Sequence, residues 1–118
     1  MTEQELLLKA DEFIEANTED IIRDIKAVVD IPSVKSEAKE GAPFGVEVRR
    51  ALGKALEIGE RMGFKTVNCG DYLGYAELVG EKEEYIGTIA HLDVVPAGNG
   101  WNTDPYDMVV KDGYLMGR

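Results

Sequence analysis

The only histidine of the chain, His91, is followed two positions later by the carboxylate of Asp93. Residues 85–90 before it form an uncharged run with β-branched side chains, which predicts a strand buried on both faces. Residues i and i+2 of a strand point to the same face, so we expect the imidazole and the carboxylate to project together. The carboxyl end of a strand is where open α/β sheets place their chemistry. The pair is typical of the start of a metal site.

The spacing alone does not settle what this pair does. A zinc site needs three or four protein ligands, and His91 with Asp93 supplies at most two. A lone histidine near the end of a core strand is often a hydrogen-bonded structural residue. A single metal held between two chains, by His91 from one and Asp93 from the other, is a further alternative.

The overall composition indicates a folded protein of one domain. A chain of 118 residues with 44% hydrophobic and 8% aromatic residues can bury a modest core, which argues against disorder. The net charge is −10, from 13 basic and 23 acidic residues. This excess of negative charge argues against nucleic acid and anionic membranes as partners.

Cysteine usage and the N-terminus bear on the cellular compartment. Cys69 is the only cysteine, so no internal disulfide can form, and a reducing compartment is the natural setting. The first residues carry acidic side chains where a signal peptide would carry basic ones. No apolar run approaches the roughly 20 residues of a membrane span. These features predict a cytoplasmic protein.

Two helices must precede the histidine. Thr2 and Glu5 fit a capping box, and the apolar residues that follow recur at helical spacing. They predict a helix over about 3–30, with a possible break near 17, that stops before Pro32. After a polar loop over 33–45, a second helix is expected over about 45–62, ended by Gly63.

The remainder of the chain predicts about five strands. They cover residues 64–69, 72–79 with a possible bulge at Gly74, the central segment from Tyr85, and 108–110 with 114–116 around an Asp112-Gly113 turn. The expected fold class is α/β, with two N-terminal helices followed by a mixed β-sheet. Both helices precede the sheet and the chain stops directly after a strand. We therefore expect residues 1–118 to be the front part of something longer.

Several segments together resemble one protein family. The segments are 88–98, Gly100-Trp101, Asp104-Pro105 and 113–118, with further agreement at Ile31-Pro32-Ser33, Phe44-Gly45 and Gly63-Phe64. The family comprises the zinc-dependent peptidases and deacylases that include acetylornithine deacetylase, succinyl-diaminopimelate desuccinylase, carboxypeptidase G and carnosine dipeptidase. The chain is most similar to the bacterial dipeptidases of the Xaa-His, or β-alanyl, type.

The resemblance implies a partial catalytic domain of a co-catalytic zinc exopeptidase. Members hold two zinc ions, and a metal-bridging water attacks the scissile carbonyl of a small peptide with a glutamate as general base. The resemblance makes His91 a ligand of one zinc and Asp93 the carboxylate that orients the imidazole. The family's other ligands and its base would lie beyond Arg118, so residues 1–118 alone are expected neither to hold zinc tightly nor to hydrolyse peptides.

Two alternatives remain beside the dipeptidase. An N-acyl amino acid deacylase of the acetylornithine or succinyl-diaminopimelate type would share the same motif. A non-catalytic remnant is also possible, and it would form homo-oligomers through an exposed sheet edge or face. Trp101 either lines an active-site entrance or packs against its own loop, and Asp104-Pro105 is expected to set a turn.

Overall fold

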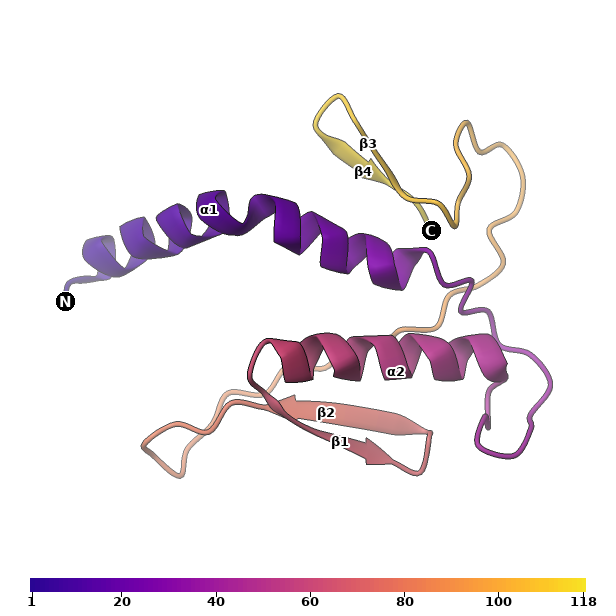
Figure 1. The fold of residues 1–118 in the computed structure, drawn as a ribbon, viewed down its shortest axis with the longest axis horizontal. Coiled ribbons are helices and arrows are strands. Elements are labelled where there is room, and N and C mark those ends of the chain that lie inside the picture. Colours follow the sequence, from indigo (N-terminus) through magenta and orange to yellow (C-terminus); the bar gives the residue numbers. More distant parts are fainter.

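The computed structural model describes all 118 residues and contains two helices and four short strands (Figure 1). In chain order the elements are α1 (Glu3–Val29), α2 (Val46–Arg61), β1 (Lys65–Cys69), β2 (Leu73–Glu77), β3 (Val109–Lys111) and β4 (Tyr114–Met116). The molecule measures 50 × 39 × 19 Å, and only seven residues are buried. The expected α/β class and the two N-terminal helices are confirmed.

Helix α1 begins as the sequence predicts. The Thr2 hydroxyl accepts a hydrogen bond from the Glu5 N–H at 3.2 Å, and the Glu5 carboxylate accepts one from the Thr2 N–H at 2.7 Å. The helix is continuous, so the possible break near 17 does not occur. Instead the side chains of Asn17 and Thr18 bond back to carbonyls one turn earlier. Such bonds often bend helices, and α1 is visibly curved in Figure 1.

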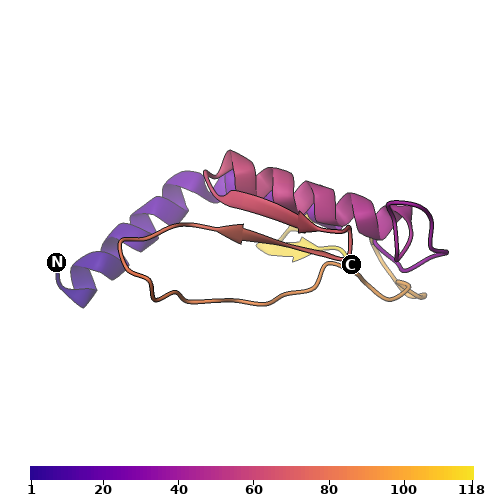
Figure 2. The same ribbon diagram turned by 90° about the horizontal axis from the view of Figure 1, so that it is seen from below.

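Helix α2 lies over the β1–β2 hairpin (Figure 2). Its buried residues are Ala51 and Leu52, and Gly63 ends it with a positive φ of 91°, as predicted. The bulge suggested at Gly74 is absent, because Gly74 pairs with Asn68 in the regular antiparallel register. A Cβ at Gly74 would lie 2.9 Å from a Leu56 methyl group, so the glycine allows the helix and the hairpin to approach closely.

The second hairpin, β3–β4, confirms the turn expected at Asp112-Gly113. Both turn residues have positive φ, 52° and 79°, which matches the twist that a two-residue hairpin requires. Met108, directly before β3, is buried beside the C-terminal end of α1. Neither helix is long and apolar enough to cross a membrane.

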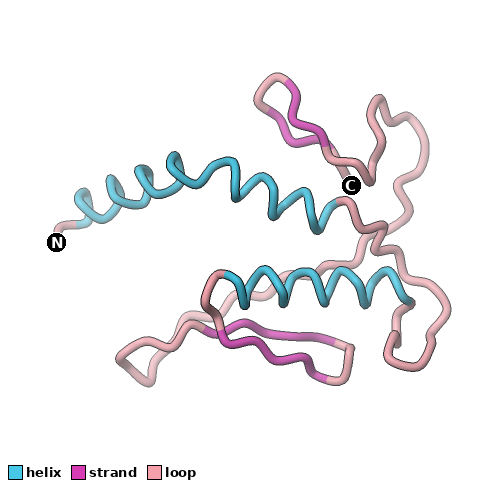
Figure 3. The backbone as a smooth tube through the Cα atoms, in the orientation of Figure 1, coloured by secondary structure: helices cyan, strands magenta, loops and turns pink.

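The prediction of one mixed sheet of about five strands is wrong. The structure has two separate two-stranded antiparallel sheets, and the expected central strand is an extended segment, residues 84–93, without strand partners (Figure 3). Ile86 and Ile89 are 97% and 102% exposed. A strand buried on both faces needs neighbours on both edges and a layer on each side, and no other segment of this thin molecule supplies them. The one parallel pairing is an isolated bridge between Val34 and Val94.

Candidate functional site

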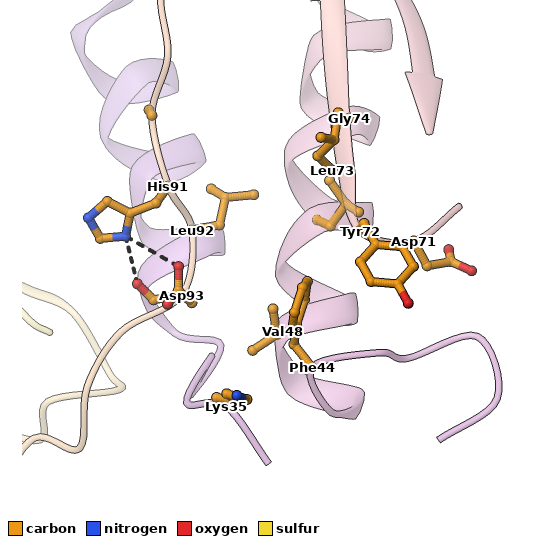
Figure 4. Close-up of a pocket in the computed structure, with 12 residues that line it drawn as sticks. Lys35, Phe44, Val48, Asp71, Tyr72, Leu73, Gly74, His91, Leu92 and Asp93 are labelled. Carbon is orange, nitrogen blue, oxygen red and sulfur yellow. Dashed lines mark hydrogen bonds and ion pairs between the residues drawn. The ribbon is translucent and has the colours of Figure 1, made fainter. Parts of the chain in front are cut away.

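The side chains of His91 and Asp93 lie together on one side of the extended segment (Figure 4). The His91 Nδ1 atom is 2.8 Å from the Asp93 carbonyl oxygen and 3.5 Å from the Asp93 Oδ1 atom. The His91 side chain is 83% exposed. The expected projection to one side is therefore present even though the strand is not, because an extended backbone alone alternates its side chains.

The hydrogen bond of Nδ1 determines what the His91 ring can offer. A carbonyl oxygen can only accept, so the neutral ring carries its proton on Nδ1 and presents a lone pair on Nε2. A histidine fixed in this way is suited to bind a metal through Nε2. Sequence reasoning missed that the nearest acceptor is the main-chain carbonyl of Asp93 rather than its carboxylate, and no sequence signal distinguishes the two.

A buried serine connects this segment to the end of α1. The Ser33 hydroxyl donates to the Leu92 carbonyl at 2.7 Å, and the Ser33 carbonyl accepts from the Val94 N–H at 3.0 Å. Ser33 is only 3% exposed. It was not predicted as a site residue, although the Ile31-Pro32-Ser33 match to the family was the available signal. At the other end, the Arg118 Nε atom donates to the Val95 carbonyl at 3.2 Å.

A cavity of about 400 Å³ lies between the extended segment, α2 and β2. Phe44 and Tyr72, whose rings meet edge to face at 5.5 Å, line one side, and Leu92 points toward them (Figure 4). His91 and Asp93 lie at its edge, and their side chains are on the far side of the segment from the two rings. The volume falls in the range of small-molecule pockets, and the apolar lining suits a hydrophobic side chain.

Asp71 is the acidic residue on the opposite side of this cavity. A hydrogen bond from the Asn68 amide holds the pKa of the Asp71 carboxyl below its usual value, and Arg49, whose Nε atom is 2.5 Å away, contributes in the same direction. The Asp71 carboxylate thus has two partners within the protein, Asn68 and Arg49. Asp71 is a structural acid that fixes the β1–β2 turn against α2.

Two other carboxylates near the C-terminal end, those of Asp104 and Asp107, also have protein partners. Asp107 pairs with Lys26, and Asp104 accepts from the Tyr106 N–H at 2.9 Å, which confirms the turn predicted at Asp104-Pro105. The Trp101 indole donates to the Ala97 carbonyl at 2.8 Å. This bond favours the interpretation in which Trp101 packs against its own loop.

The residues present do not make a complete zinc site. No group of three or more His, Cys, Asp or Glu side chains lies close enough to hold a metal ion. Zinc takes three or four protein ligands, and the chain offers one exposed imidazole with the adjacent Asp93 carboxylate. Any zinc at His91 would therefore require further ligands, from additional polypeptide or from a second chain.

Comparison with known proteins found relatives named as dipeptidases. The chain is 41% identical over 102 residues to "Putative dipeptidase YtjP" of Bacillus subtilis (strain 168), a match that covers 85% of this chain and 22% of that protein. It is 39% identical over 100 residues to "Putative dipeptidase SH1171" of Staphylococcus haemolyticus (strain JCSC1435), covering 83% and 21%. A Staphylococcus aureus (strain USA300) relative, "Putative dipeptidase SAUSA300_1697", is 37% identical over 109 residues, covering 91% and 23%. No protein-family model matches the chain.

The extent of these matches is as informative as their identity. They cover most of this chain but only about a fifth of each relative's length. The similarity therefore concerns one portion of a dipeptidase-like protein, and the activity of such a whole protein is a matter for proposal.

Proposed function

We propose that this chain forms the His91-containing portion of a zinc-dependent dipeptidase. The observation that carries the proposal is the exposed His91 ring, whose Nδ1 is occupied by Asp93 while Nε2 is left free for a metal. The similarity to proteins named as dipeptidases supports the reaction class. In this proposal His91 is a ligand of one of two zinc ions, and Asp93 holds the ring.

The proposal assigns the rest of the site to polypeptide outside residues 1–118. The remaining ligands and the general base would come from that further polypeptide, since no group of three metal-binding side chains lies together within the chain, and the substrate would be a small peptide. The cavity beside Phe44 and Tyr72 is a candidate pocket for one substrate side chain. Residues 1–118 alone are expected to be inactive, and no reaction step is assigned to them.

A chimera tests the proposal directly. The matched 102 residues of the Bacillus subtilis relative are replaced by those of this chain, and hydrolysis of β-alanyl-histidine and Ala-His is measured beside the unaltered relative. We expect hydrolysis that is abolished by a chelator and restored by zinc. His91→Ala should lower kcat/KM by more than about 100-fold, since loss of an outer partner of a metal ligand already costs 10–100-fold.

Two controls make the chimera decisive. Glu12→Ala, an exposed change on α1, should leave the rate unaltered. N-acetylornithine and N-succinyl-diaminopimelate are assayed in parallel, because their preferential hydrolysis would favour the deacylase alternative. A chimera that folds but hydrolyses no dipeptide, beside an active relative, would refute the dipeptidase proposal.

Self-assembly is a second candidate function, favoured by the unpaired segment 84–93. Residues 85–90 carry no charge, so two copies can approach there despite the net charge of −10. An antiparallel pairing centred on Gly87 would set Tyr85 opposite Ile89, and Glu83 opposite His91, of the second copy. Aromatic–β-branched pairs such as Tyr85 with Ile89 stabilise strands.

Light scattering after size exclusion tests this second candidate. We expect the 118-residue chain to elute as a dimer or larger, and Ile89→Lys to shift it toward the monomer. Val110→Lys, at a residue 55% exposed on the other hairpin, is the matched control. A monomeric parent chain at high micromolar concentration would refute self-assembly through this segment.

A further inference from the structure

Ser33 stands out among the buried residues because it is the one polar side chain in the core. It is 3% exposed, and both of its polar oxygens are used on the same distant segment. The hydroxyl binds the carbonyl of Leu92 and the carbonyl binds the N–H of Val94, so the two hydrogen bonds flank Asp93 on either side. No other residue outside residues 84–95 makes two hydrogen bonds to them.

Ser33 is itself held firmly. Its N–H donates to the Ile31 carbonyl at 2.7 Å, and Ile31 is 6% exposed at the end of α1. The next N–H, of Val34, donates to the Pro32 carbonyl at 2.7 Å, and Val34 forms the parallel bridge with Val94. Proline fixes one backbone angle at this point, which limits the movement of the serine. The end of α1 thus presents Ser33 as a fixed point.

The segment that Ser33 holds has little else to fix it. Residues 84–93 have no strand partner, and His91 and Asp93 are exposed. The distance between the His91 ring and the Asp93 carbonyl depends on the backbone angles of Leu92 and Asp93. These are the residues that the two Ser33 hydrogen bonds bracket.

We infer that Ser33 is a positioning residue that sets the geometry of His91 by clamping the backbone on both sides of Asp93. The clamp consists of hydrogen bonds within this chain and does not depend on the proposed function. Only its effect on catalysis rests on that proposal. Removing the hydroxyl should let the Leu92 peptide rotate, which weakens the bond from the His91 Nδ1–H to the Asp93 carbonyl. Nε2, the nitrogen proposed to bind a metal, would then carry the proton in a larger share of molecules.

The test uses the 118-residue chain, in which His91 gives the only imidazole signals. Nitrogen-15 NMR at a fixed alkaline pH reports the share of the neutral ring protonated on Nδ1, and hydrogen exchange reports the Val94 amide. Ser33→Ala should lower the Nδ1–H to Nε2–H ratio and speed Val94 exchange, each by about threefold to tenfold, as expected for one buried hydrogen bond. Ser33→Thr, which keeps the hydroxyl, should restore both values toward the parent.

Controls separate positioning from general destabilisation. Ser36→Ala makes the same chemical change at an exposed serine in the same loop and should leave both signals unaltered. If Ser33→Ala does not fold, the hydrogen bond is tested in the parent chain instead, by measuring the through-bond coupling between the Val94 nitrogen and the Ser33 carbonyl carbon. An absent coupling, or equal tautomer ratios in Ser33→Ala and the parent, would overturn the inference.

The inference and the proposed function fail independently. The NMR measurements need no metal and no substrate, so they can support the clamp even if the chimera is inactive. In an active chimera Ser33→Ala should lower kcat more than it raises KM, with recovery in Ser33→Thr. An unchanged kcat in a folded Ser33→Ala chimera would overturn the catalytic consequence while leaving dipeptidase activity established.

Discussion

Lys26 and Asp107 are 81 positions apart in the chain, and the Lys26 Nζ atom lies 2.6 Å from the Asp107 carboxylate. The same ammonium group is 2.8 Å from Asp30 and donates to the Met108 carbonyl at 3.1 Å. One lysine of α1 therefore holds the chain that leads into β3. The β3–β4 hairpin depends on this contact because few other polar bonds join it to the helices.

This contact should make stability sensitive to alkaline pH. Hydrogen bonds from Asp107 first, and Asp30 second, raise the pKa of Lys26 above its usual 10.5. A raised folded-state pKa gives stability that is complete below about pH 10.5 and is lost as pH rises through the folded value. Thermal unfolding followed from pH 9 to pH 12 should show this loss.

The variant Lys26→Met should remove the alkaline dependence and lower the unfolding midpoint at pH 8. Lys54→Met is the matched control, because Lys54 pairs only with its helical neighbour Glu57. Equal pH profiles for the two variants would contradict a special role for Lys26.

Acid should weaken two other connections. The Arg61 guanidinium lowers the pKa of Asp24, which joins α1 to α2, and the Asn68 amide is the main cause of the lowered pKa of Asp71. A lowered carboxyl pKa gives stability that is present above about pH 3.8 and is lost as pH falls through the folded value. Asn68→Ala should raise the Asp71 pKa, measured by carboxyl NMR, and leave that of Asp24 unchanged.

Gly74→Ala should destabilise the contact between α2 and the first hairpin. An added Cβ would meet Leu56 at 2.9 Å and the Val67 carbonyl at 3.0 Å, and the backbone carbonyl cannot swing away as a side chain can. Overpacking of this kind costs about 1–3 kcal/mol, measurable by urea denaturation. Gly80→Ala, where nothing lies within 4 Å of the new Cβ, should change the free energy of unfolding by far less.

Asp93→Ala distinguishes the two acceptors of the His91 ring. The main-chain carbonyl is the nearer one, so the variant should keep the Nδ1–H tautomer while losing the carboxylate at 3.5 Å. In the chimera we expect a decrease in kcat/KM of about 10–100-fold, the usual cost of removing an outer partner of a metal-binding histidine. A loss as large as that of His91→Ala would indicate that Asp93 touches the metal itself.

Local features of the fold could be predicted because their causes lie within a few residues. The Thr2–Glu5 capping box and the Asp112-Gly113 turn each follow from neighbouring side chains and backbone angles. The strand expected from Tyr85 onward could not be judged this way. A strand forms only with partners, and the pattern of one segment does not reveal whether those partners are present.

The candidate site likewise combines a local feature, which could be predicted, with contacts that could not. The juxtaposition of His91 and Asp93 follows from alternation along an extended chain, which is a local property. The participation of Ser33 comes from a contact across 59 residues, and the role of the Asp93 carbonyl belongs to the backbone that every residue has. Neither contact can be recognised from the types of the residues and their spacing.

The long reach of the Ser33 clamp also bears on the order of folding. Both helices and both hairpins join residues that are near in sequence, whereas the clamp must close a loop of 59 residues. Closing such a loop loses chain entropy before its two hydrogen bonds are gained. On a translating ribosome both helices would thus be complete before His91 is synthesised, and the histidine would be captured by a surface already in place.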